Sequence, residues 1–372
     1  MIWRNVKRAF ILSAFIMLSV HLLHSCSRVS VRTETFYVMD TFAQSTLITT
    51  SDALGNRLNR DIAEILAEVE GRISRTDATS EIYKLNEMLN MGRGGINFNL
   101  TAETARLLIL AQDIRQAANG AFSPVLGRII DLWGISNQET EPALPAAHEF
   151  FPALQRTKPP FSDYSIIYDG HTGMISAEYY GYKFDLSGIA RGYALDRVSA
   201  YLESEGIQHA HISLGGASVL ALGRNRDGHL WSIGVRNPLN PEIYSGVIQA
   251  SDKFISAAIG YERYITIDGI NYIHIIDPST GYPVHNDLLG VVVVMDAPSA
   301  SMPQARRERF RNNGAISDAL STALFVMGRQ GAVDFYMNNP FDFEMILFIR
   351  NQSDPRGYEI LHTNVIFNEF NN

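Results

Sequence analysis

Segments of helical and of strand periodicity alternate along this chain, and tight-turn signals join several of the strand segments. Residues 56–74 repeat apolar side chains at helical spacing, whereas residues 265–276 alternate them around Asp268-Gly269, a dipeptide typical of two-residue hairpins. Hairpins give antiparallel pairing, because parallel strands need a long crossover connection. The pattern therefore predicts an α+β fold in which mixed, largely antiparallel sheets pack against helices, rather than a doubly wound parallel sheet.

The expected elements extend over almost the whole chain. Thr101 is typical of a helix cap, and Gly206 and Gly328 are typical of helix ends. Helices are therefore also expected at 101–118, 189–205 and 317–327, with a further one after Gly328. Strands are expected at 37–49, 165–169, 174–178, 210–222, 230–236, 244–250, 290–295, 343–350 and 357–363. The stretches 141–160 and 297–314 are expected to be surface loops. No stretch is typical of an interdomain linker, so 36–372 is predicted to be one domain.

Composition excludes several classes of protein. Hydrophobic residues make up 46% of the chain and charged residues 19%, which excludes general disorder. The formal net charge is -8, which argues against a nucleic-acid partner. Cys26 is the single cysteine, so the chain can form neither an internal disulfide nor a metal site built from its own cysteines.

The N-terminus is typical of an export signal. Arg4, Lys7 and Arg8 precede an apolar run over 9–23, and Cys26 follows closely. This order resembles a bacterial lipoprotein signal, in which the cysteine is lipidated and becomes the first mature residue; an ordinary secretory signal and a membrane-anchored form are the alternatives. The interpretation is a signal peptide over 1–25 and a tether over 26–35. The expected location is the cell envelope, with a lipid anchor on the periplasmic face of the cytoplasmic membrane.

Two residues near the C-terminal end of the chain could bind a metal. Asp318 and Thr322 are four positions apart and share one face of a predicted helix. A carboxylate and a hydroxyl can both offer oxygen to a hard cation such as Mg²⁺. The alternative is an ordinary helix start with an aspartate in its first turn.

Residues 272–283 form a strand that leads into a turn. His274 lies among apolar residues on the side of Tyr272 and Ile276, where it is either a general base or a satisfied core histidine. Asp277 and Gly281 fit the chemistry of the turn that follows.

A strand-to-helix junction at 185–196 could present backbone N–H groups to an anion. Arg191 could pair with a phosphate there, or could simply be solvated. The glycine pair Gly215-Gly216 allows close approach to a ligand, or forms only a turn. Trp133 could line a cofactor pocket or pack in the core.

In order and spacing, these segments resemble the flavin transferase (ApbE) family, the FAD:protein FMN transferases. The resemblance covers nearly all of the predicted mature chain, and each motif is weak alone. Its parts are Met39-Asp40-Thr41, Ser80-Glu81-Ile82 with Leu85-Asn86, 120–127, Leu132-Trp133-Gly134, 185–196, Gly215-Gly216, 261–264, 274–283 and 317–328.

The resemblance implies a single ApbE-like catalytic domain and a Mg²⁺-dependent reaction. FMN would pass from FAD to a threonine hydroxyl of an acceptor protein, and AMP would leave. Asp318, Thr322 and the backbone of Gly188 would bind Mg²⁺, and His274 would be the catalytic base. The acceptors implied are proteins of membrane redox complexes. The residues assigned to FAD are Met39, Asp40, Tyr83, Trp133, Asp185, Arg191, Asp196, Gly215, Gly216, Ile259, Arg263 and Asp277.

Two departures from the family pattern keep other functions open. Residues 257–260 read Ala-Ala-Ile-Gly where family members often carry Thr-Ser-Gly-Asp, and Arg191 replaces the usual lysine. The alternatives are a Mg²⁺-dependent FAD pyrophosphatase that gives FMN and AMP, and a non-catalytic flavin-binding lipoprotein.

Overall fold

An eight-stranded antiparallel sheet organises the molecule. The computed structural model describes residues 29–91, 96–135, 141–157, 164–177, 183–261 and 263–370. The order of strands across the sheet is β1-β2-β6-β7-β10-β13-β14-β15, and each neighbouring pair is antiparallel. The strands are β1 (Ser30–Val38), β2 (Thr41–Thr49), β6 (Ala210–Leu214), β7 (Ser218–Leu222), β10 (Lys253–Ile259), β13 (Leu288–Asp296), β14 (Glu344–Arg350) and β15 (Tyr358–His362).

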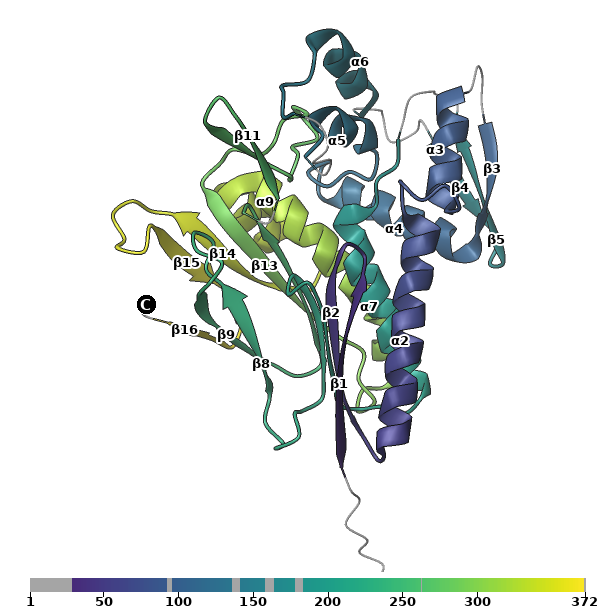
Figure 1. Ribbon diagram of the computed structural model, residues 1–372, viewed down its shortest axis with the longest axis vertical. Coiled ribbons are helices and arrows are strands. Elements are labelled where there is room, and N and C mark those ends of the chain that lie inside the picture. Colours follow the sequence, from purple (N-terminus) through teal and green to yellow (C-terminus); the bar gives the residue numbers. More distant parts are fainter. Residues whose placement is uncertain are drawn as a thin grey trace, which may run out of the picture.

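Three helices cover one face of this sheet: α2 (Asp52–Ile73), α7 (Ser187–Ser204) and α9 (Asn313–Asn338) (Figure 1). The largest hydrophobic cluster lies between these helices and the sheet, and includes Leu58, Leu195 and Leu320. Burial of such an apolar face, at about 25 cal/mol per Å², is the main force that holds the helices on the sheet.

A three-stranded sheet packs on the other face, and it consists of β8 (Trp231–Arg236), β9 (Tyr244–Ala250) and β16 (Phe367–Glu369). A second apolar cluster, which includes Ile233 and Val292, fills this interface. The remaining elements lie around the helical layer and at one end of the large sheet (Figure 1). They are α3 (Glu81–Met91), β3 (Ile96–Thr101), α4 (Ala102–Ala117), α5 (Gly127–Trp133), α6 (Ala147–Thr157), β4 (Tyr164–Tyr168), β5 (Thr172–Ala177), β11 (Tyr264–Ile267), β12 (Ile270–Ile273) and α8 (Gln304–Arg309).

The fold class predicted from the sequence is confirmed, as are several local elements. Thr101 caps α4, because its hydroxyl accepts the N–H of Thr104. β11 and β12 form the expected hairpin around Asp268-Gly269, and β14 pairs with β15. Gly328, with φ at 71°, interrupts α9 where the first half of the helix was expected to end.

Other boundaries were wrong. Residues 30–35, predicted as tether, belong to β1, and the single strand expected at 37–49 is the β1–β2 hairpin. The strand expected at 210–222 is likewise a hairpin, β6–β7. In each case one type I′-like turn, with positive φ at both central residues, divides the segment that was predicted as a single strand.

The helix that carries Asp318 begins at Asn313 rather than at Ser317, so the aspartate lies in the second turn. The loops expected at 141–160 and 297–314 contain α6 and α8, while α3, α5, β3 and β10 were not predicted at all. The predicted signal peptide and Cys26 lie outside the described residues. Within those residues, no helix combines the length and hydropathy that a bilayer crossing needs.

Candidate active site

The site begins where α7 crosses α9. An added Cβ at Gly192 would lie 2.0 Å from the carbonyl oxygen of Gly314, and one at Gly314 would lie 2.5 Å from the carbonyl oxygen of Gly192. No side chain fits at such distances, so glycine at both positions lets the two helices touch backbone to backbone. The contact brings the second turn of α9 against the first turns of α7.

Asp318 is one of two buried carboxylates at this crossing. Its Oδ2 accepts the N–H of Gly192 at 3.0 Å, and its Oδ1 accepts the hydroxyl of Ser218 at 3.1 Å. Burial raises the pKa of Asp318, and the positive charge of Arg191 opposes that shift. A buried carboxylate with only partial compensation is a place where a cation binds favourably. Sequence reasoning missed Ser218, although its position just after the glycine pair was a usable signal.

Thr322 and Gly188 lie close to each other near Asp318. Thr322 follows Asp318 by one helical turn, and an added Cβ at Gly188 would lie 3.7 Å from Thr322 Oγ1. A carboxylate, a hydroxyl and a backbone carbonyl are the hard oxygen donors that Mg²⁺ prefers, so the residues present fit this ion. Among the described residues, no three His, Cys, Asp or Glu side chains form a metal-binding group. A Mg²⁺ ion here would therefore complete its shell with water and phosphate oxygens.

Arg191 gives this region its positive charge. It lies in the second turn of α7, close enough for its charge to favour ionised Asp318 and to lower the pKa of His274. The N-terminal end of α7 adds a partial positive charge from the helix dipole. A guanidinium and a helix N-terminus together suit a phosphate-bearing ligand.

His274 lies directly after β12 rather than inside a strand, which corrects the sequence prediction. Its backbone N–H donates to the carbonyl of Arg263 at 3.0 Å, and its Nδ1 lies 3.2 Å from the same oxygen. A carbonyl only accepts, so Nδ1 carries the proton and Nε2 keeps a free lone pair. Burial lowers the pKa of His274 to about 4, assisted by the charges of Arg191 and Arg263. The imidazole is therefore neutral near pH 7 and can accept a proton.

Two adjacent hairpin turns lie at the same end of the large sheet. Met39 and Asp40 occupy the β1–β2 turn with φ of 54° and 56°, and Gly215 and Gly216 occupy the β6–β7 turn with φ of 64° and 73°. An added Cβ at Gly215 would lie 2.5 Å from Thr41 Oγ1, so the turns are in contact. Positive φ costs glycine little but strains methionine, and such strain concentrates at functional sites.

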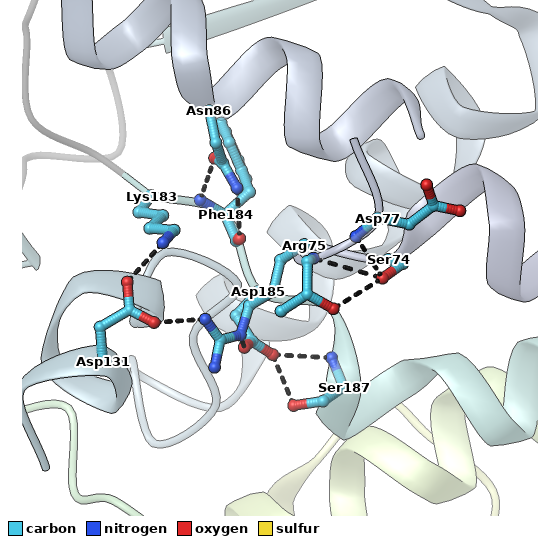
Figure 2. Close-up of polar contacts among 10 residues, drawn as sticks. Ser74, Arg75, Asp77, Asn86, Asp131, Lys183, Phe184, Asp185 and Ser187 are labelled. Atoms are coloured by element: carbon cyan, nitrogen blue, oxygen red, sulfur yellow. Dashed lines mark hydrogen bonds and ion pairs between the residues drawn. The ribbon is translucent and has the colours of Figure 1, made fainter. Parts of the chain in front are cut away.

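The segment before α7 is fixed by side chains from distant parts of the chain (Figure 2). The amide of Asn86 accepts the N–H of Phe184 at 2.7 Å and donates to its carbonyl at 2.9 Å. Asp185 accepts the N–H of Ser187 at 2.8 Å, and its other oxygen lies 2.5 Å from Arg75 Nε. Asp185, predicted as a flavin contact, thus has both oxygens occupied by protein. The sequence analysis did not predict Arg75. It included Asn86 in the Leu85-Asn86 motif but assigned it no role.

Asp196, also predicted as a flavin contact, has a structural role instead. Its two carboxylate oxygens accept the N–H groups of Gly314 and Ala315, both at 2.8 Å. These groups lie in the first turn of α9, so Asp196 caps that helix from α7. The side chain is only 5% exposed, and both of its oxygens accept these backbone N–H groups.

Trp133 and Asp277 shape the same loop. Trp133 is buried in a small apolar cluster and packs against Tyr272 and Tyr282, and its indole N–H donates to the carbonyl of Gly281 at 2.7 Å. The packing interpretation of Trp133 is therefore the one that the structure supports. Asp277 Oδ1 accepts the N–H of Ser279 at 2.7 Å and shapes the same turn.

The remaining predicted flavin residues are spread out. Ile259 ends β10 opposite Gly290, and it lines a small pocket with Gly215 and Gly216 on the face of the sheet toward β8. The unusual residues 257–259 are therefore strand residues and not a turn. Tyr83 is half-buried in the first turn of α3, and Arg263 contributes its carbonyl to His274 while its side chain is exposed.

The protein therefore has an α+β fold, and its candidate site combines the buried carboxylate of Asp318, the charge of Arg191 and the neutral imidazole of His274. Comparisons with known proteins give the family to which this fold belongs. The ApbE family model matches residues 39–347. The chain is 27% identical to the FAD:protein FMN transferase of Vibrio cholerae, over 73% of this chain and 74% of that protein. It is 24% identical to the FAD:protein FMN transferase of Haemophilus influenzae, over 79% and 80% of the two chains.

Solved structures agree in fold. Flavin transferase ApbE from Vibrio cholerae superposes with a TM-score of 0.72 at 23% identity, over 90% of this chain and 98% of that one. The ApbE protein of Thermotoga maritima gives a TM-score of 0.72 at 24% identity, over 90% and 97%. The chain belongs to the ApbE family.

Proposed function

We propose that this protein transfers FMN from FAD to a threonine hydroxyl of an acceptor protein and releases AMP. One observation carries the proposal. Asp318, Thr322 and Gly188 lie together at the start of α7, and the charge of Arg191 reaches both Asp318 and His274. The names of the family relatives support the same reaction class.

The chain's own residues suit each part of the reaction. Nε2 of His274 accepts the proton of the threonine hydroxyl, whose oxygen attacks the flavin-side phosphorus of FAD. A phosphoester bond to FMN forms, the pyrophosphate bond breaks, and AMP leaves with the bridging oxygen. Arg191 offsets the negative charge that gathers on the phosphate oxygens.

Asp318, Thr322 and the carbonyl of Gly188 would bind Mg²⁺. When bound, the ion supplies positive charge to the pyrophosphate and the departing AMP. Asp318 is the strongest of the three ligands, because only its carboxylate brings a formal negative charge.

One assay tests the proposal. The purified protein is incubated with FAD, Mg²⁺ and an acceptor domain that carries the target threonine, and the products are separated. Flavin fluorescence on the acceptor band together with equimolar AMP is the expected result. FMN and AMP without a labelled acceptor would favour the pyrophosphatase, and bound, uncleaved FAD would favour a flavin-binding lipoprotein.

We also propose that Cys26 carries a lipid anchor on the periplasmic face of the membrane, and that the acceptors are proteins of membrane redox complexes. β1 begins at Ser30, so only residues 26–29 would separate the anchor from the sheet. β1 has 9 residues and ends at the Met39 turn. At about 3.3 Å per residue, it would hold the site about 30 Å from the anchored end. Metabolic labelling with a fatty acid, lost in Cys26→Ala, tests the anchor.

A further inference from the structure

Arg75 connects two carboxylates at the edge of the site. It follows Ser74, the C-cap of α2, and its side chain is only 18% exposed. Its Nε lies 2.5 Å from Asp185 Oδ2, and its Nη1 pairs with Asp131 of α5 (Figure 2). The guanidinium thus pairs through two different nitrogens with two different carboxylates.

Asp185 connects Arg75 to the start of α7. Its Oδ1 accepts both the N–H of Ser187, at 2.8 Å, and the Ser187 hydroxyl, at 2.5 Å. Ser187 is the first residue of the helix, and Gly188, whose carbonyl is a proposed metal ligand, comes next. The chain of contacts therefore runs from Arg75 through Asp185 to the backbone beside the metal site.

Asp131 closes the arrangement into a ring. It pairs with Lys183 as well as with Arg75, and Lys183 lies two residues before Asp185. Backbone bonds fix the same stretch, because Gly127 N–H donates to the carbonyl of Lys183 at 2.9 Å and Asp185 N–H donates to that of Pro124 at 2.8 Å. Residues 183–187 are therefore held at both ends, and Arg75 is the only side chain that joins the two carboxylates among the described ion pairs.

The ring also balances charge. Asp185 is nearly fully buried at the N-terminal end of α7, where its negative charge would repel a diphosphate. Arg75 offsets that charge while it leaves Arg191 free for the ligand. A lysine would keep the charge but could not span both carboxylates.

We propose that Arg75 is a positioning residue of the active site: through Asp185 it fixes the Ser187–Gly188 backbone, and so sets Mg²⁺-dependent binding of the FAD diphosphate. This inference rests on the proposed function, and it concerns a residue that contacts neither the metal ligands nor His274. Without the Arg75 guanidinium, the Gly188 carbonyl should move by a fraction of an ångström to an ångström. A displacement of about this size can reduce kcat/KM by on the order of 10²-fold.

The test compares Arg75→Gln, Arg75→Lys and Arg72→Gln in the full-length protein. Arg72, in the last turn of α2 and three residues before Arg75, is a matched control, because its described ion pairs are with Glu68 and Glu103 and not with residues 183–187. For each variant, KM for FAD, kcat, the Mg²⁺ concentration at half-maximal activity and the melting temperature are measured. Flavin fluorescence anisotropy gives the Kd for FAD at each Mg²⁺ concentration.

Arg75→Gln should raise KM for FAD and the half-maximal Mg²⁺ concentration more than kcat falls, and Arg75→Lys should restore only part of the loss. Arg72→Gln should lower the melting temperature without either change. The inference fails if Arg75→Gln keeps the wild-type Mg²⁺ dependence, or if Arg72→Gln shifts it equally. If the wild type binds FAD but labels no acceptor, the proposed function fails while the Kd series still decides the role of Arg75. If the wild type binds no FAD at all, both fail.

Discussion

Asp196 and Asp318 face the same helix crossing but have different partners. Both are buried, and both have a pKa raised by burial. Asp196 accepts two backbone N–H groups of α9, which can only donate. Asp318 accepts the N–H of Gly192 and the hydroxyl of Ser218, and a hydroxyl can donate or accept.

This difference separates a structural carboxylate from a functional one. Both hydrogen-bond partners of Asp196 are N–H donors, so the side chain at this position needs two acceptor oxygens, which a carboxylate supplies. Around Asp318 an amide could make the two hydrogen bonds to Gly192 and Ser218 as well, since its NH₂ could donate to Ser218. These two hydrogen bonds therefore do not require the negative charge of Asp318; Arg191 favours that charge, and the proposed cation would favour it too.

The largest expected effect is on turnover. Asp318→Asn and Asp318→Ala should each reduce kcat by on the order of 10³-fold or more, because the only formally charged metal ligand is lost. AMP release and acceptor labelling measure the effect. An Asp318→Asn variant with near wild-type activity would refute the metal assignment.

The same variant gives a second measurement, of stability. A carboxyl with a raised pKa in the folded state loses stability as pH rises from its unfolded pKa through its folded one. Asp318→Asn should therefore melt at or above the wild-type temperature near pH 7 without Mg²⁺, and Mg²⁺ should stabilise only the wild type. Equal stabilisation of both proteins by Mg²⁺ would place the ion elsewhere.

Asp196→Asn should have the converse profile. The amide NH₂ would point at a backbone N–H, which leaves a buried donor of α9 unpaired and should cost about 3 kcal/mol of unfolding free energy. Chemical denaturation measures that loss. The fraction that stays folded should keep kcat within about threefold, since about 0.6 kcal/mol of transition-state energy corresponds to that factor. A severe loss of kcat in well-folded Asp196→Asn would make Asp196 part of the site.

Substitutions of Thr322 test, with a smaller expected effect, whether its hydroxyl is a ligand of the proposed Mg²⁺ ion. Thr322→Val keeps the shape but removes the oxygen, and should raise the Mg²⁺ concentration for half-maximal activity by about tenfold. Thr322→Ser keeps the oxygen and should stay close to wild type. If valine and serine behave alike, the hydroxyl is not a ligand.

Local sequence patterns predicted the features that depend on a few neighbouring residues. The Asp268-Gly269 hairpin, the Thr101 cap and the interruption at Gly328 all follow from turn and capping chemistry. The first part of β1 was not predicted because β1 is an edge strand. Its residues 30–35 are polar or charged except for Val31, so they show no apolar alternation.

The site residues also differ in whether neighbouring residues or distant segments determine their role. Asp318 and Thr322 share a helix face, and Gly188 lies close to Thr322; their role as metal ligands stays a prediction. No local pattern could distinguish Asp196 from Asp318, because their partners come from segments about 100 residues away. Trp133 and Asp185 were likewise assigned to the ligand, although long-range packing and the Arg75 ion pair occupy them.

The last prediction concerns His274, whose pKa shift has the opposite sign to that of Asp318. Burial holds its pKa at about 4, below the ordinary value of 6.5, so the unfolded chain binds the proton more readily between these values. The free energy of unfolding of the ligand-free protein should therefore fall as pH drops from about 6.5 to about 4. His274→Gln should remove that part of the slope, and the two proteins should match more closely above pH 7, where the histidine is neutral in both states. Denaturation series at pH 4.5 and 7.5 measure the difference. An equally steep acid loss in His274→Gln would mean that His274 is not held neutral, and would remove the basis for its role as a proton acceptor at low pH.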